Sequence, residues 1–147
     1  MTMLIENCGP KIEFRDIAAL ELELSAGLPE SYREFLLRYN GGTPTPDTVD
    51  VPGAPGTPTD VQVLFGIGRS VESSDLEWNL SLVAERCIGF RVLPIACDSG
   101  GNLFCLKVER GVAAEVIYCD LHAPDCVSYR VAPSFEQFIS KLRPLEH

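Results

Sequence analysis

The stretch from Leu28 to Gly42, LPESYREFLLRYNGG, predicts a short amphipathic helix with a defined start and end. Pro29 suits the first turn of a helix, because the backbone N–H groups of that turn have no intrahelical acceptor. The apolar side chains that follow are spaced as i, i+3, i+4 and i+7 and form one stripe: Tyr32, Phe35, Leu36 and Tyr39. Asn40, Gly41 and Gly42 come next, and these residue types accept the positive φ at which helices end. The stretch therefore predicts a capped helix that packs on a core.

A second helix is predicted just before it, in residues 13–25, EFRDIAALELELS. The leucines at 20, 22 and 24 alternate with glutamates as in a strand, but four apolar residues have helical spacing: Phe14, Ile17, Leu20 and Leu24. Alanine, leucine and glutamate are strong helix formers, so we favour the helix. Gly27 is expected to end it, which predicts an N-terminal helical pair.

The middle of the chain begins with a proline-rich segment, residues 43–60, that holds five prolines and two glycines. It is predicted to be a long extended loop without regular elements, of a kind that is either functional or disordered. A strand is predicted at residues 61–65 and a middle helix after it. Ser74 and Glu77 have the spacing of a capping box for this helix. Its predicted buried stripe is Leu76, Leu80, Val83 and Cys87, and Trp78 lies off the stripe.

Four further strands are predicted at residues 91–97, 102–109, 115–120 and 126–131. The turns between them are short, which makes neighbouring strands antiparallel. A last helix, residues 134–142, carries its apolar residues on one side: Phe135, Phe138, Ile139 and Leu142. The order of elements predicts an α+β fold, in which a single antiparallel sheet of about five strands packs with the N-terminal helical pair, the middle helix and the C-terminal helix.

Two motifs resemble signatures of the SUKH superfamily, the Smi/Knr-like domains. The first is the LP–aromatic–hydrophobic–NGG helix described above. The second is VLPIACDSGGNLFCLKV at residues 92–108, followed by VIYCDLH at residues 116–122. In that family an IP-I-A-x-D-x-x-G-N hairpin precedes a strand that ends in Tyr-x-x-Asp/His. The resemblance extends from about Ile12 to Leu142, and the proline-rich segment departs from it.

The chain of 147 residues is 46% hydrophobic, which predicts one ordered domain, assigned to residues 1–144. Residues 145–147, Leu-Glu-His, resemble the start of an expression tag and are set aside. The first residues lack the basic and apolar regions of a signal peptide, and no apolar run reaches the roughly 18 residues of a membrane span. We therefore expect a cytoplasmic protein that does not bind membranes.

The formal net charge is −9. Nucleic-acid-binding proteins usually carry a basic face, so nucleic acid is not expected as a partner. An acidic surface favours basic protein partners, although acidity can also serve solubility alone.

The six cysteines lack the spacing of a disulfide scaffold and are expected to be reduced. Three of them, Cys87, Cys97 and Cys105, occur among apolar residues and are predicted to pack as small hydrophobic side chains. Zinc binding by Cys119, His122 and Cys126 is the sharper alternative, but a closed site needs four ligands and this set has three.

No catalytic residue, metal site or cofactor is predicted. A hydrolase that uses His122 would need a nucleophile and an orienting partner that the sequence does not identify. Residues 98–102, Asp-Ser-Gly-Gly-Asn, are predicted to form a hairpin turn and not a phosphate-binding loop, because a strand and not a helix follows them.

Acidic residues gather in the proline-rich segment, at the start of the middle helix and at strand ends. If these regions adjoin, they form one acidic rim with Trp78 as an exposed anchor; otherwise the charges are simply solvated and Trp78 is covered. The predicted partner-binding residues are Asp47, Asp50, Asp60, Glu72, Asp75, Glu77, Trp78, Asp98 and Asp120.

The SUKH resemblance implies a non-enzymatic immunity protein. Such a protein binds and neutralises a cognate secreted toxin domain of a bacterial polymorphic or contact-dependent toxin system. The expected partner is a basic nuclease domain, and the expected mechanism is mimicry of phosphate charge by carboxylates. The resemblance leaves a regulatory protein-binding scaffold of the cell-wall-regulator type as the alternative. A small hydrolase is the third possibility, and the oligomeric state is not predicted.

Overall fold

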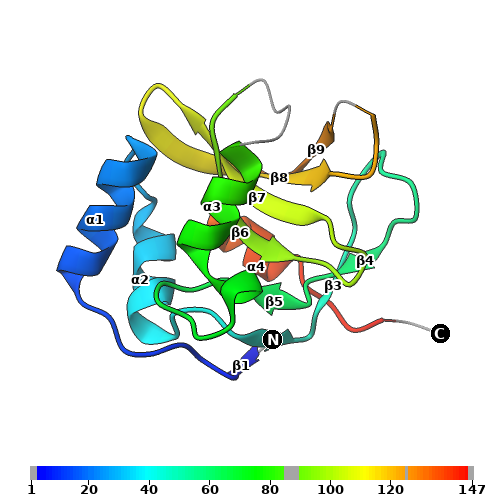
Figure 1. The fold of residues 1–147 in the computed structure, drawn as a ribbon. Helices are drawn as coiled ribbons and strands as arrows, with labels where there is room; N and C mark the ends of the chain where they lie inside the picture. The colour runs from blue at the N-terminus through cyan, green and yellow to red at the C-terminus, as the bar shows by residue number, and fades with distance from the viewer. Residues whose placement is uncertain (1–2, 85–89, 125, 146–147) are drawn as a thin grey trace.

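The computed structural model describes residues 3–84, 90–124 and 126–145 (Figure 1). Cys87, which was predicted to be buried, lies outside these ranges. The elements in chain order are β1 (Leu4–Glu6), α1 (Phe14–Leu24), α2 (Glu30–Arg38), β2 (Thr43–Thr45), β3 (Thr48–Val49), β4 (Thr59–Asp60), β5 (Val63–Leu64), the 3-10 turn η1 (Glu72–Ser74), α3 (Leu76–Ala84), β6 (Val92–Cys97), β7 (Leu103–Glu109), β8 (Val112–Asp120), β9 (Val127–Ala132) and α4 (Phe135–Ser140).

The main sheet has five antiparallel strands in the order β5-β6-β7-β8-β9. Each strand pairs with the next strand of the set. The antiparallel pairing of β6 to β9 follows from their short connections, whereas η1 and α3 lie between β5 and β6. Figure 1 shows α3 against one face of the sheet and α4 against the other. On the α4 side, the rings of Phe104 and Phe138 are 5.2 Å apart. The predicted α+β fold is confirmed.

The predicted N-terminal helical pair is confirmed as α1 and α2. Ile17, Leu20 and Leu24 of α1 are buried. Two details of α1 were predicted wrongly. The helix ends at Ser25, which takes the left-handed conformation, and not at Gly27. Phe14 is 74% exposed, because at 3.6 residues per turn it belongs to a different row of the helix from the three buried residues.

The apolar stripe of α2 packs against α4, near the other end of the chain. Tyr32, Phe35 and Leu36 are buried, and Tyr39 is half-buried. The ring of Phe135 on α4 lies 4.8 Å from the ring of Tyr32 and 5.3 Å from that of Phe35. These aromatic contacts attach the helical pair to the sheet layer.

A corner of the chain follows α2 at Asn40, Gly41 and Gly42, where all three residues have positive φ. Buried Asn40 accepts a hydrogen bond from the Ile67 N–H and donates to the carbonyl oxygens of Ile67 and Pro10. A Cβ on Gly41 would lie 2.6 Å from the carbonyl oxygen of Leu64, so a side chain cannot fit there. The NGG motif therefore ends α2 and joins it to β5.

The proline-rich segment, residues 43–60, is more regular than predicted. β2 pairs with β1, and β3 pairs with β4 through Thr48 opposite Asp60. The prediction of a loop without regular elements is therefore wrong. Prolines are compatible with these strands because a two-stranded pair has edge positions where no N–H has to be donated.

Candidate partner-binding surfaces

The start of α3 places three of the predicted residues side by side in the chain: Asp75, Glu77 and Trp78. Trp78 is 40% exposed, whereas its neighbours Leu76 and Asn79 are buried. An aromatic ring that is accessible on a rigid helix is typical of an interface anchor.

Asp75 provides the cap of α3. Its Oδ2 accepts a hydrogen bond from the Trp78 N–H at 3.2 Å, and its Oδ1 accepts one from the Arg69 N–H at 3.1 Å. The capping box predicted from Ser74 is wrong, because Ser74 is part of η1 and the helix begins one residue later than the box requires.

The carboxylates at this end of α3 repel one another. Partial burial raises the pKa of the Glu77 carboxyl, and the charges of Glu23 and Asp75 raise it further. Glu23 lies on α1, so two helices contribute to the same cluster, and Glu23 was not among the predicted residues. We call Glu23, Glu72, Asp75 and Glu77 the α3 acidic group.

Asp98, by contrast, lies inside the protein. It is 3% exposed, and its carboxylate accepts four hydrogen bonds: from the Gly100 and Asn102 N–H groups at 3.0 and 2.9 Å, and from the Thr59 and Tyr118 hydroxyls at 2.8 and 2.5 Å. The assignment of Asp98 to a partner-binding surface is therefore wrong. This carboxylate builds the β6–β7 turn, whose prediction as a hairpin turn is confirmed.

Asp60 and Asp120 lie near the same turn. Asp60 accepts hydrogen bonds from the Ser99 N–H at 2.8 Å and the Ser99 hydroxyl at 2.5 Å. Asp120 accepts one from the His122 N–H at 3.0 Å, and the His122 ring contacts the Gly100 carbonyl oxygen at 2.8 Å. The exposed Asp47 lies close to Asp60, because its backbone carbonyl oxygen accepts a hydrogen bond from the N–H of Val61, the residue that follows Asp60. We call Asp47, Asp60 and Asp120 the sheet-end group.

Asp50 is paired within the chain. The guanidinium of Arg143 donates to both of its carboxylate oxygens, at 2.9 and 3.0 Å, and lowers the pKa of Asp50. Across the described ranges, no hydrogen bond or ion pair joins the α3 acidic group to the sheet-end group. That the predicted residues form one continuous rim therefore stays a prediction.

Most basic side chains in the described residues are already engaged within the chain. Five pair with carboxylates (Arg15, Arg33, Lys107, Arg130 and Arg143), and three bind backbone carbonyl oxygens (Arg69, Arg91 and Lys141). Glu23, Glu72 and Glu77 have no cationic partner in this part of the chain. The α3 acidic group thus has negative charge available to a partner.

The zinc site considered for Cys119, His122 and Cys126 is not assembled in the described residues. Cys119 is 1% exposed and lies beside the buried thiol of Cys105, whereas His122 is exposed. Burial raises the pKa of the Cys105 thiol, as expected of a core residue. No group of three or more histidine, cysteine or acidic side chains in the described ranges could hold a metal ion.

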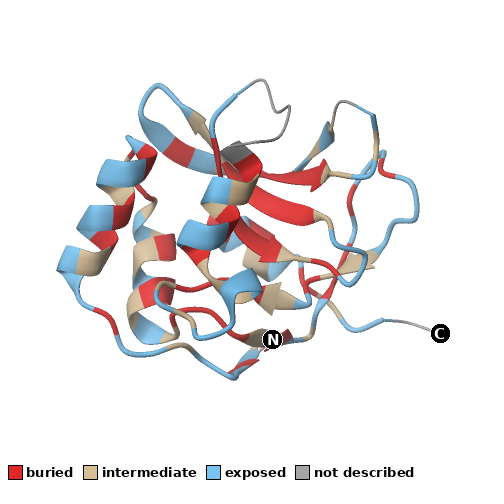
Figure 2. Ribbon diagram, in the orientation of Figure 1, coloured by how far each residue is buried: buried red, intermediate tan, exposed pale blue. Residues whose placement is uncertain are grey.

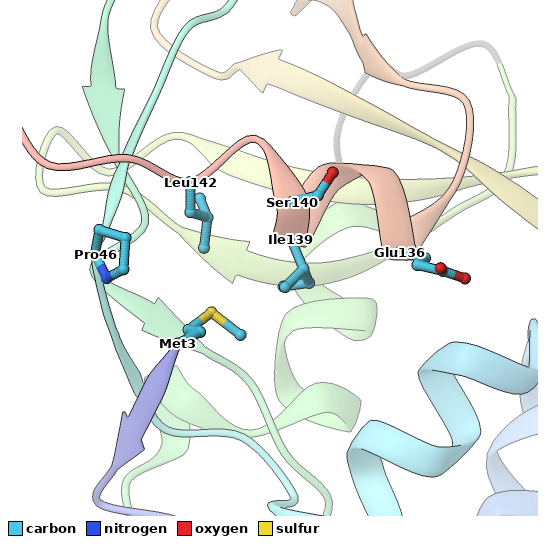
Figure 3. Close-up of a pocket in the computed structure, with 6 residues that line it drawn as sticks. All are labelled: Met3, Pro46, Glu136, Ile139, Ser140 and Leu142. Carbon is cyan, nitrogen blue, oxygen red and sulfur yellow. The ribbon is translucent and has the colours of Figure 1, made fainter. Parts of the chain in front are cut away.

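A surface groove runs along α4 and was not predicted. One hollow of about 240 Å³ is lined by Met3, Pro46, Glu136, Ile139, Ser140 and Leu142 (Figure 3). A second hollow of about 470 Å³ shares Met3, Glu136 and Ile139 and extends to Phe35, Glu34 and Arg38 of α2. The groove has an apolar floor with glutamates at its rim. It was missed because α2, α4 and β1 are far apart in the sequence.

Comparison with known proteins shows the family to which the chain belongs. Residues 11–141 match the model of the SMI1 / KNR4 family (SUKH-1). The chain belongs to this family. The SUKH-1 chain is also 30% identical over 146 residues to the SPbeta prophage-derived uncharacterized protein YokK of Bacillus subtilis (strain 168), an alignment that covers 86% of this chain and 74% of that protein. No solved structure matches the chain.

Domains of the SUKH-1 family typically bind partner proteins. In the ranges that the structure describes, no helix is both long enough and apolar enough to cross a membrane. The two family motifs have structural roles in this chain, at the Asn40 corner and at the Asp98 turn. The candidates for contact with a partner are therefore the more exposed surfaces: the α3 acidic group, the sheet-end group and the α4 groove.

Proposed function

We propose that this SUKH-1 protein is an immunity protein. It binds the cognate secreted toxin domain of a bacterial toxin system and neutralises that domain by covering a basic, phosphate-binding surface. A nuclease domain fits best, because its substrate path is lined with cations that carboxylates can occupy. The protein needs no catalytic residue for this function.

The observation that carries the proposal is the unneutralised α3 acidic group beside an exposed tryptophan. Partial burial raises the pKa of Glu77, and the negative charges of Glu23 and Asp75 raise it further. A lysine or arginine of a partner relieves that repulsion, and Trp78 can bury its ring next to the new ion pairs. Electrostatic attraction of this kind also speeds association.

The test is co-expression of the protein with a candidate toxin domain encoded by a gene adjacent to its own, followed by a pull-down. Cells that express the toxin domain alone should die, and cells that also express this protein should survive and yield a stable complex. Absence of rescue from a toxin domain that is clearly lethal would contradict the proposal.

Two variants with equal loss of charge locate the binding surface. Glu72→Gln with Glu77→Gln removes two charges from the α3 acidic group, and Asp47→Asn with Asp120→Asn removes two from the sheet-end group. The first variant should slow association about tenfold and flatten its dependence on salt. The second should bind as the wild type does. Equal binding by both variants would dispose of charge mimicry by the α3 acidic group.

A further inference from the structure

The outward side of α1 carries an apolar row that nothing in the described structure covers. Phe14 is 74% exposed and Leu22 is 83% exposed, and exposed Ala18 lies midway between them. The spacing i, i+4, i+8 places the three on one line along the helix. Figure 2 shows this side of α1 as exposed and the opposite side as buried. Large apolar side chains aligned in this way are typical of a contact surface.

A second row runs beside the first and is polar at its ends. It consists of Arg15, Ala19 and Glu23, with the same spacing of four residues. Among the described residues, Arg15 pairs with Glu13 alone, through side chains that are 83% and 67% exposed, and such pairs contribute little. Glu23 has no cationic partner among the residues that the structure describes.

We propose that α1 is a self-association surface, on which α1 of a second copy of this chain packs antiparallel. In a two-fold pair of antiparallel helices, each row meets the same row of the partner in reverse order. Phe14 then lies against the second copy's Leu22, and Ala18 lies near its own counterpart. In the other row, Arg15 of each copy faces Glu23 of the other. The centres of the two rows differ by one residue, or about 1.5 Å, which side chains can absorb.

The charges of Arg15 and Glu23, and the small alanine side chains between the ends of the rows, favour a second copy of this chain as the partner of α1. A reversed copy of the polar row neutralises both of its ends at once, and it brings a cation to Glu23. Alanine at the centre of both rows lets the helix axes approach closely, at the short end of the usual 8–10 Å. The area is small, since α1 has 11 residues, so the dimer is a weak one that forms at high concentration. Glu23 belongs to both this surface and the α3 acidic group, but the tests of self-association below need no toxin domain.

The first test is analytical ultracentrifugation of the full chain between about 10 µM and about 1 mM. The wild type should move from monomer to a monomer–dimer mixture, and Leu22→Glu should stay monomeric. Arg15→Glu alone and Glu23→Arg alone should each weaken the dimer at least about threefold, because like charges then face each other. The double variant restores opposite charges on both sides and should dimerise as the wild type does. These positions are exposed, so circular dichroism should report unchanged folding.

Cross-linking tests the antiparallel register. In a Cys8→Ser background, which removes an exposed native thiol, Ala18→Cys should form an intermolecular disulfide on mild oxidation with oxidised glutathione. Glu34→Cys, an exposed position on α2, is the matched control and should not. A chain that is monomeric at every concentration overturns the proposal, as does a dimer that survives Leu22→Glu. If the chain is monomeric and Leu22→Glu instead impairs capture of the toxin domain, the row belongs to that partner.

Discussion

The side chain of Asn40 is hydrogen-bonded to both backbone groups of Ile67. Its Oδ1 accepts from the Ile67 N–H at 2.7 Å, and its Nδ2 donates to the Ile67 carbonyl oxygen at 2.8 Å. The same Nδ2 donates to the Pro10 carbonyl oxygen at 2.9 Å. One buried amide therefore connects the end of α2 with the chain before α1 and the chain after β5.

Removal of this amide should be costly. Asn40→Ala removes the side-chain partner of three backbone groups, the Ile67 N–H and the carbonyl oxygens of Ile67 and Pro10, and should lower the free energy of unfolding by about 1–3 kcal/mol more than Asn7→Ala does. Asn7 is the matched control, because it also has positive φ but is exposed and makes one side-chain hydrogen bond, to Thr43 Oγ1. Urea denaturation of both variants measures the difference, and equal losses would show that only the backbone conformation matters.

Two buried tyrosines should respond to phenylalanine in opposite directions. The Tyr32 hydroxyl is fully buried and has no hydrogen-bond partner in the described structure, so Tyr32→Phe should stabilise the protein by about 1 kcal/mol. The Tyr118 hydroxyl donates to Asp98 and accepts from Asn102, so Tyr118→Phe should destabilise it by about 1–3 kcal/mol. Thermal unfolding distinguishes them, and a loss of stability in Tyr32→Phe would mean that its hydroxyl finds a partner in solution.

Asp98 should matter for folding and Asp120 should not. Asp98→Ala removes the acceptor of four hydrogen bonds and should cost about 3 kcal/mol or more, whereas Asp120→Ala removes one exposed hydrogen bond and should cost under about 1 kcal/mol. Denaturant titration with an unchanged m value checks this. Similar small losses for both would return Asp98 to the list of surface residues.

Two glutamates should give opposite dependences of stability on pH. Partial burial alone would raise the pKa of Glu21, but hydrogen bonds from the Leu28 N–H and from Arg33 lower it. Its stabilisation is therefore present above the unfolded value of about 4.3 and is lost as the pH falls through the folded pKa. The pKa of Glu77 is raised, so its ionisation costs stability as the pH rises through its folded pKa.

The two corresponding variants check these signs. At neutral pH, Glu21→Gln should be less stable than the wild type by about 1 kcal/mol, and Glu77→Gln should be slightly more stable. Both differences should shrink in acid, where the carboxyl groups are protonated. Unfolding free energies measured from about pH 3 to about pH 8 show the signs, and a parallel pH profile for Glu77→Gln and the wild type would mean that burial and the charges of Glu23 and Asp75 do not raise the pKa of Glu77.

Much of the fold was predictable because its determinants are local. The stripe Tyr32–Phe35–Leu36, the apolar runs of β6, β7 and β8 and the short turns between them each lie within a few residues, so the local sequence reveals them. The end of α1 at Ser25 and the cap of α3 at Asp75 were missed, because neighbouring residues compete as helix ends and tertiary contacts decide between them.

The candidate surfaces were less predictable because they are assembled from distant segments. From the sequence, Asp98 was predicted to be a surface carboxylate, because Thr59 and Tyr118, whose hydroxyls donate hydrogen bonds to it, are distant in the chain. Glu23 joins Glu77 only because α1 and α3 are neighbours in space. The pairing of β1 with β2 similarly depends on residues that are far apart in the chain, which sequence periodicity cannot register.

The packing of α2 on α4 has a consequence for synthesis of the protein in the cell. Tyr32 and Phe35 leave the ribosome early, but Phe135, the ring that covers them, is made among the last residues of the described chain. Until then the nascent chain displays an aromatic face that a chaperone can bind. The domain therefore completes its folding only after nearly the whole described chain has been translated, and a chain that terminates before α4 keeps this face open to degradation.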